Sequence, residues 1–187
     1  EEQCFSEIKI NRAVQGDTPD VLTDIYQENT NIVTWQRDLS QALRSAIDDF
    51  LKCHKTKATV LAVTPENTQD TLIEAFGEAE IKPALRDDIA LLVDMFCCLF
   101  DLKGAGLRIS VLERAMCPRF HVDKIPCRLV TTYRGVATDW LHHDVIDREK
   151  LGAGHQGKPD EQSGLFKNLN DINQLTQGDV ALLKGEG

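Results

Sequence analysis

The residues best suited to chemistry are His121 and Asp123, a His-x-Asp pair in the second half of the chain. Residues two apart on an extended strand project from the same face, so the pair should bring an imidazole and a carboxylate within about 5 Å of each other. These groups are two-thirds of the 2-His-1-carboxylate triad, which holds Fe(II) and leaves positions open for substrate and oxygen. A His-x-Asp pair also occurs as a plain ion pair on a protein surface. The surrounding residues must therefore decide between a metal site and an ion pair.

Two cysteines flank this pair and allow a different metal. Cys117 precedes His121, and Cys127 follows Asp123. Thiolates and imidazole suit Zn(II), and a closed set of all four side chains would be structural or regulatory, without catalysis. In a chain long enough to have its own core, all six cysteines are expected to be free thiols in a reducing cytoplasm.

Arg128 and Arg134 are candidates for binding a cofactor, because they lie on or beside a strand predicted over 127–133. On that strand Arg128 shares a face with Val130 and Thr132, and neither face is purely apolar. Such a mixture is expected where a strand lines a polar cavity. A strand with one side in water gives the same pattern.

Composition narrows the classes of partner. The net charge is −9, with 42% hydrophobic and 27% charged residues, and acidic residues are spread along the chain. Such a surface repels phosphate backbones and anionic lipid, so neither nucleic acid nor a membrane is expected as a partner. There is no run of about 20 apolar residues and no signal-peptide pattern, which favours a cytoplasmic protein. The substrate, a small molecule or a protein, is left open.

The first part of the chain, 1–103, is predicted to be mainly helical with short strands. Apolar residues recur at helical spacing after Asp38, with Gln41 three residues on as in a capping box. Further helices are expected from Pro65 to Gly77 and after Pro83, the last of them largely buried. Short strands are predicted at 31–35 and 60–63.

The second part, 104–187, is predicted to be mainly β, because the apolar pattern changes to alternation after Gly106. Strands are expected at the positions 107–111, 127–133, 136–141 and 180–183. The stretch 151–164 is rich in glycine and polar residues and is predicted to be a flexible loop. Helices first and strands later indicate a single α+β domain over 1–187, with a helical layer packed on an antiparallel sheet or barrel.

Several stretches together resemble one bacterial family, domain of unknown function 1826. They are VTWQR at 33–37, CPRFHVDKIPCRLVTTYRG at 117–135, TDWL at 138–141 and GDVALLKG at 178–185. The order of His-x-Asp, a variable insertion and a Gly-Asp turn is also similar to that of cupins and 2-oxoglutarate-dependent oxygenases. This likeness implies a double-stranded β-helix, or jelly roll, as the β part of the fold.

The resemblance also implies a function related to a metal. Chains of the family continue to a histidine followed by arginine, so the third metal ligand is expected beyond Gly187 and the jelly roll is expected to be incomplete at its C-terminus. Family members often lie beside zinc-homeostasis genes. Three hypotheses follow: a non-haem Fe(II)- and 2-oxoglutarate-dependent oxygenase using His121 and Asp123, a zinc-binding protein without catalysis, and a metal-free cupin-like binding module.

Overall fold

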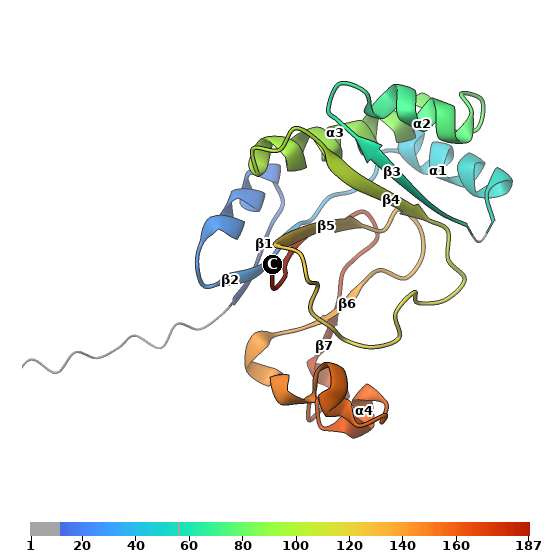
Figure 1. Ribbon diagram of the computed structural model, residues 1–187. Coiled ribbons are helices and arrows are strands. Elements are labelled where there is room, and N and C mark those ends of the chain that lie inside the picture. The colour runs from blue at the N-terminus through green and yellow to red at the C-terminus, as the bar shows by residue number, and fades with distance from the viewer. Residues whose placement is uncertain (1–11, 56) are drawn as a thin grey trace, which may run out of the picture. The chain divides into compact units, whose positions relative to one another are not determined.

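We describe the protein from a computed structural model, which covers residues 12–55 and 57–187 (Figure 1). Contacts within the chain divide these residues into two compact units. The sheet unit consists of 12–37 and 119–187, and the helical unit of 38–118. The sheet unit is therefore built from both ends of the described chain. That the whole of 1–187 forms a single domain stays a prediction.

The helical unit contains three helices and a two-stranded sheet. The helices α1 and α2 each pack against α3, and the strands β3 and β4 pair antiparallel in a continuous ladder. The bounds are α1 Gln41–Cys53, β3 Ala58–Val63, α2 Thr68–Phe76, α3 Pro83–Leu99 and β4 Ala105–Ser110. The buried strand expected at 60–63 is thus confirmed as a strand, but Val60 is 68% exposed.

The start of α1 shows how local sequence sets a helix. Ser40 has an extended backbone, and its hydroxyl accepts a hydrogen bond from the backbone N–H of Leu43 at 3.2 Å. This serine, and not Asp38 as predicted, is therefore the N-cap, because it satisfies an N–H that the first turn leaves without a partner. The buried face then follows helical spacing, with Leu43, Ala46, Ile47 and Phe50.

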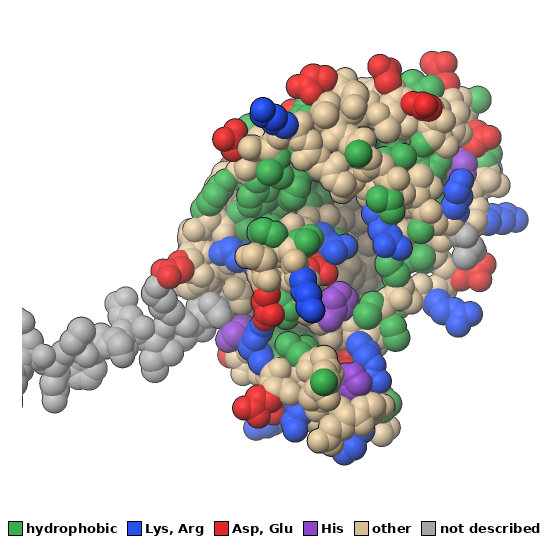
Figure 2. Space-filling view, in the orientation of Figure 1, with side chains coloured by type: hydrophobic (Ala, Val, Ile, Leu, Met, Phe, Trp, Pro, Cys, Tyr) green, Lys and Arg blue, Asp and Glu red, His purple; other side chains and the backbone are tan. Residues whose placement is uncertain are grey.

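The end of α2 and the start of α3 lie at residues that the sequence marks, but α2 begins at Thr68 and not at Pro65 as expected. Gly77 ends α2 with φ 90°, a conformation that favours glycine, and Pro83 lies in the first turn of α3. The sequence predicts that the second half of α3 is largely buried. Leu91 is 46% exposed, but the residues buried there are Ile89, Leu92, Val93 and Cys97. Asp70 and Asp87 are exposed on these helices. Figure 2 shows separate Asp and Glu side chains along the upper edge of the view, where Figure 1 draws the helices of this unit.

The main sheet of the sheet unit has the strand order β1-β2-β8-β5. Strand β8 pairs antiparallel with a neighbour on each side, and its first three residues, Val180–Leu182 in sequence, are fully buried. A strand that is buried on both faces has a continuous run of apolar residues in its sequence. This agrees with the short buried strand predicted at 180–183. The bounds are β1 Arg12–Gly16, η1 Pro19–Tyr26, β2 Thr30–Trp35, β5 Cys127–Thr131 and β8 Val180–Lys184.

A second, two-stranded sheet pairs β6 with β7, and the segment between them forms short helical turns. Leu141, Leu165 and Phe166 make a buried cluster there, against which Phe120 packs. The bounds are β6 Asp139–Leu141, η2 His143–Val145, η3 Arg148–Lys150, η4 Gly152–His155, α4 Asp160–Ser163, η5 Leu169–Asp171 and β7 Ile172–Gln174.

The mixed α/β character predicted from the sequence is confirmed, but the described strands do not form the expected jelly roll. Strand β4 pairs with β3 in the helical unit, whereas β5 joins β8, β2 and β1. Alternation of apolar residues reveals that a segment is a strand and which face is buried, but not which strand it pairs with. None of the helices in the described residues is both long and apolar enough to cross a membrane.

Candidate functional site

His121 and Asp123 lie side by side, although the strand predicted to carry them is absent. Both belong to a stretch, 111–126, that contains neither helix nor strand. Pro118 and Pro126 flank the pair, and proline cannot donate a hydrogen bond to a sheet ladder. The distance from His121 Nε2 to Asp123 Oδ1 is nevertheless 3.5 Å, within the 5 Å that the spacing predicts.

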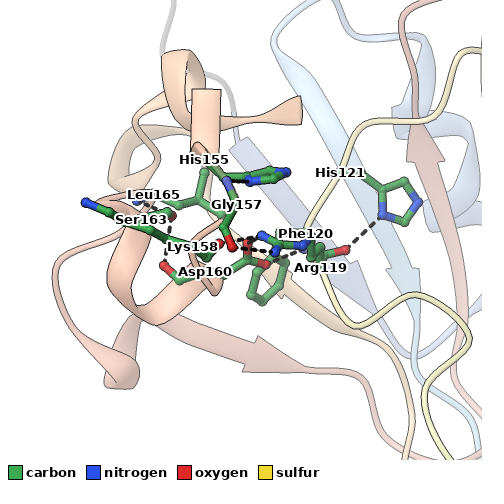
Figure 3. Close-up of polar contacts among 9 residues, drawn as sticks. All are labelled: Arg119, Phe120, His121, His155, Gly157, Lys158, Asp160, Ser163 and Leu165. Carbon is green, nitrogen blue, oxygen red and sulfur yellow. Dashed lines mark hydrogen bonds and ion pairs between the residues drawn. The ribbon is translucent and has the colours of Figure 1, made fainter. Parts of the chain in front are cut away.

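The ring of His121 is oriented by a backbone carbonyl. Its Nδ1 lies 3.0 Å from the carbonyl oxygen of Arg119 (Figure 3). A carbonyl only accepts hydrogen bonds, so we assign the proton of the neutral ring to Nδ1. The lone pair of Nε2 then faces the carboxylate of Asp123. The side chain of His121 is 56% exposed, so a ligand can reach it from solvent.

The carboxylate of Asp123 is held by the guanidinium of Arg128. Arg128 Nε lies 2.7 Å from Oδ2, and Nη2 donates to Oδ1 at 3.2 Å. This is the two-pronged geometry that makes arginine–carboxylate pairs specific. An ionised carboxylate has about four lone-pair sites, so each oxygen keeps capacity for another partner. The side chain of Asp123 is 18% exposed, whereas that of Arg128 is 46% exposed.

The backbone of Asp123 is held by the last residues of the chain. Its carbonyl accepts the N–H of Glu186 at 2.8 Å, and the carbonyl of Pro126 accepts the N–H of Gly185 at 3.0 Å. A Cβ on Gly185 would lie 2.0 Å from the oxygen of Ile125 and 2.5 Å from that of Asp123. Only glycine allows two backbones to approach so closely.

Residues of the stretch 151–164 hold Arg119 and Phe120, which come directly before His121. Asp160 accepts the backbone N–H of Phe120 at 2.7 Å, and Arg119 donates through Nη1 to the carbonyl of Lys158 at 2.6 Å. The sequence predicts only a flexible loop here and gives no role to Asp160 or Arg119. These partners are about 40 residues apart, and no local pattern signals such a contact.

The two cysteines of the alternative zinc set differ in their surroundings. Burial raises the pKa of the Cys127 thiol to about 11, so it resists becoming the thiolate that binds zinc. Cys117 is exposed and lies near the end of the helical unit. No three His, Cys, Asp or Glu side chains gather into a possible metal site within residues 12–55 and 57–187. None of the described cysteines forms a disulfide, and Cys4 lies outside the described residues.

The two arginines predicted to bind a cofactor, and two further histidines of the sheet unit, have the following surroundings. Arg134 is exposed in the turn after β5, and the guanidinium of Arg128 is engaged with Asp123. The ring of His142 packs edge-on against Trp140, with centroids 4.6 Å apart. His155 accepts the N–H of Gly157 through Nδ1 at 2.8 Å. A neutral His155 therefore carries its proton on Nε2, which leaves that atom without a lone pair for a metal.

Comparison with known proteins gives one match. Searches of curated proteins and of solved structures each found no similar protein. The model of the family described as protein of unknown function (DUF1826) matches residues 16–187, which confirms the resemblance seen in the sequence. The match covers most of the chain, so the chain belongs to the DUF1826 family.

Proposed function

We propose that the protein binds Fe(II) through His121 Nε2 and Asp123 Oδ1, as part of an oxygenase-like site. The observation that carries the proposal is the hydrogen bond between His121 Nδ1 and the Arg119 carbonyl. Histidines that bind metals commonly donate their other ring N–H to a carbonyl, which fixes the tautomer and the ring orientation. Here that bond leaves the Nε2 lone pair aimed at a carboxylate oxygen 3.5 Å away, and a cation between the two satisfies both.

The contacts of Asp123 are compatible with this role. Metal-binding carboxylates are themselves held by hydrogen bonds, and Arg128 supplies two. Oδ1 can accept from Arg128 and still offer a second lone pair to a metal. The same contacts make Arg128 a weaker candidate for the carboxylate of 2-oxoglutarate, because two of its donors already serve Asp123. Arg134, the other candidate for binding 2-oxoglutarate, is exposed in the turn after β5.

The residues described here supply two ligands of a facial triad, and each has a defined task. His121 donates an electron pair from Nε2, and Asp123 brings a negative charge that favours a divalent cation. Iron bound in a facial triad supplies open coordination positions for oxygen chemistry. With only two protein ligands, we expect weak binding. The proposal rests on this donor geometry and does not require a jelly roll.

The test is an anaerobic titration of the full chain with Fe(II), comparing the wild type with His121→Ala and Asp123→Asn. Both variants should lose binding, because each removes one of the two ligands. Lys124→Ala is the matched control, since this exposed neighbour supplies no metal ligand at neutral pH. It should bind as the wild type does. Absence of Fe(II) binding in the wild type, or binding that survives His121→Ala, would contradict the proposal.

Zinc binding is the alternative to iron binding. Substitutions of the two cysteines distinguish the two. Cys117→Ser should leave the affinity for Fe(II) nearly unchanged, whereas a zinc site built on both cysteines should lose Zn(II) with either Cys117→Ser or Cys127→Ser. The raised pKa of Cys127 works against the zinc site. Tight Zn(II) lost with either substitution would replace the iron proposal.

A metal-free binding module is the second candidate, and the Arg128–Asp123 pair favours it. The guanidinium already neutralises the carboxylate. A proton on Nε2 of His121 would complete an ion pair with Asp123 without any metal. In that case the wild type binds no divalent cation, and Asp123→Asn lowers the free energy of unfolding because it leaves Arg128 without its charged partner.

A further inference from the structure

Asp160, the first residue of the short helix α4, is the one buried residue of the stretch 151–164, and the proposed metal site does not use it directly. Its side chain is 8% exposed, whereas the next residue, Glu161, is exposed. Asp160 Oδ2 accepts the backbone N–H of Phe120 at 2.7 Å, and Oδ1 lies 3.7 Å from Nη1 of Arg119. A buried carboxylate is costly unless it is paired and hydrogen-bonded, so these contacts explain how the chain tolerates it.

The N–H that Asp160 accepts belongs to the same peptide group as the carbonyl that orients His121. The peptide between Arg119 and Phe120 offers its N–H to Asp160 and its C=O to Nδ1 of His121 (Figure 3). A peptide group is planar, so fixing the direction of its N–H also fixes the direction of its C=O. A charged acceptor on the N–H further polarises the group and strengthens the hydrogen bond at the C=O.

The side chains on either side of this peptide are also held. The Arg119 guanidinium donates to the carbonyl oxygens of Lys158 and Gly157, at 2.6 and 3.5 Å. The ring of Phe120 meets Phe166 edge-on, with centroids 6.0 Å apart. The peptide is thus anchored at both ends, and Asp160 fixes its rotation between those anchors.

We propose that Asp160 is a positioning residue for His121, acting through the Arg119–Phe120 peptide. It keeps the proton of the neutral ring on Nδ1 and the Nε2 lone pair directed toward Asp123. Its effect on metal affinity rests on the proposed function, but its effect on the ring does not. The two can therefore be measured separately.

The first measurement is made on the metal-free protein. The ring nitrogens of His121 are assigned by ¹⁵N NMR at pH 8.5, and the exchange rate of the Phe120 amide is measured in the same samples. Asp160→Ala should shift the neutral ring from the Nδ1–H toward the Nε2–H tautomer and speed Phe120 exchange. Asp160→Asn keeps an oxygen that can accept from Phe120 but loses the charge, so it should fall between the wild type and Asp160→Ala. Glu161→Ala is the matched control and should change neither signal.

The second measurement is the affinity for Fe(II), titrated anaerobically in the same set of variants. Asp160→Ala should weaken binding by about 10- to 100-fold, the usual effect of removing a group that orients a metal ligand. Altered His121 signals with no Fe(II) binding even in the wild type would support the positioning role and overturn the proposed function. Unchanged His121 signals in folded Asp160→Ala would overturn the positioning role. Should Asp160→Ala fail to fold, unchanged signals in Asp160→Asn would do the same.

Discussion

The helical unit and the segment that carries His121 are held in different ways. In the helical unit, α1 is set by a cap three residues from its partner and by apolar residues at spacings of three and four. In the sheet unit, Phe120 is held by Asp160 across 40 residues, and Asp123 by Glu186 near the end of the described chain. The first kind of contact is local and repeated, whereas the second depends on single, distant partners.

This difference predicts where substitutions do their damage. A repeated apolar face loses stability in proportion to the buried volume removed, and it does so mainly through the hydrophobic effect. A segment held by single backbone contacts is sensitive to small steric and electrostatic changes that leave the core intact. The predictions below test that contrast, starting with the largest expected effect.

Leu72→Ala in α2 should lower the free energy of unfolding by about 2–5 kcal/mol, because the side chain is fully buried and its removal leaves a cavity. Denaturant unfolding measures the loss. Leu91→Ala in α3 is the control, since Leu91 is 46% exposed and its truncation should cost far less. Equal losses in both variants would break the link between burial and stability in this unit.

Cys127 should react with iodoacetamide roughly 100-fold more slowly at pH 8 than a thiol of ordinary pKa, because only the thiolate attacks and burial raises its pKa from 9.0 to about 11. Peptide mapping by mass spectrometry gives the rate, with exposed Cys53 as the internal comparison. A rate that stops rising with pH near 9 would show that the thiol is not shielded as the structure indicates.

The same raised pKa gives a dependence of stability on pH. Between about pH 9 and 11 the folded protein keeps the Cys127 proton that the unfolded chain releases. The folded state binds more protons in this window, so the stabilising contribution is complete below pH 9 and is lost as pH rises through 11. Cys127→Ala should flatten this part of the stability profile, and an unchanged slope would assign it to other groups.

Gly185→Ala should lower the free energy of unfolding by about 1–3 kcal/mol, because the added methyl group would overlap backbone oxygens that cannot move aside easily. It should also weaken Fe(II) binding by displacing Asp123. Gly106→Ala in β4 is the matched control, since a Cβ there meets nothing within 4 Å. A Gly185→Ala variant as stable as Gly106→Ala would mean that the last residues do not hold the site.

Ser40→Ala should cost about 1 kcal/mol, because it removes the side-chain oxygen that caps α1. Thermal unfolding of the full chain measures the change. Ser45→Ala, at an exposed position inside the same helix, should be neutral or slightly stabilising, since alanine is the better helix former. Binding of Fe(II) should be unaffected in both variants. A loss of binding with Ser40→Ala would contradict the separation between local and distant contacts.

The sequence by itself determined most of the regular elements and the adjacency of the candidate pair. The signals for these elements are helical spacing, glycine and proline at helix ends, and runs of apolar residues. Each acts within a few residues, so it can be recognised without the tertiary structure. They located α1, α2, α3, β2, β5 and β8. The His-x-Asp spacing also placed the two side chains within reach of each other, although the strand assumed for them is absent.

Only the tertiary structure decided the pairing of the strands and the support of the site. Strand β4 pairs with β3 and not with β5, because partner choice depends on how buried faces meet across the chain, which alternation does not encode. Asp160 and Gly185 acquire their roles only where the backbone brings them against Phe120 and Ile125. Contacts such as that of Asp160 provide hydrogen-bond partners for backbone groups that lie outside helices and sheet ladders. These groups need such partners only once folding removes them from water.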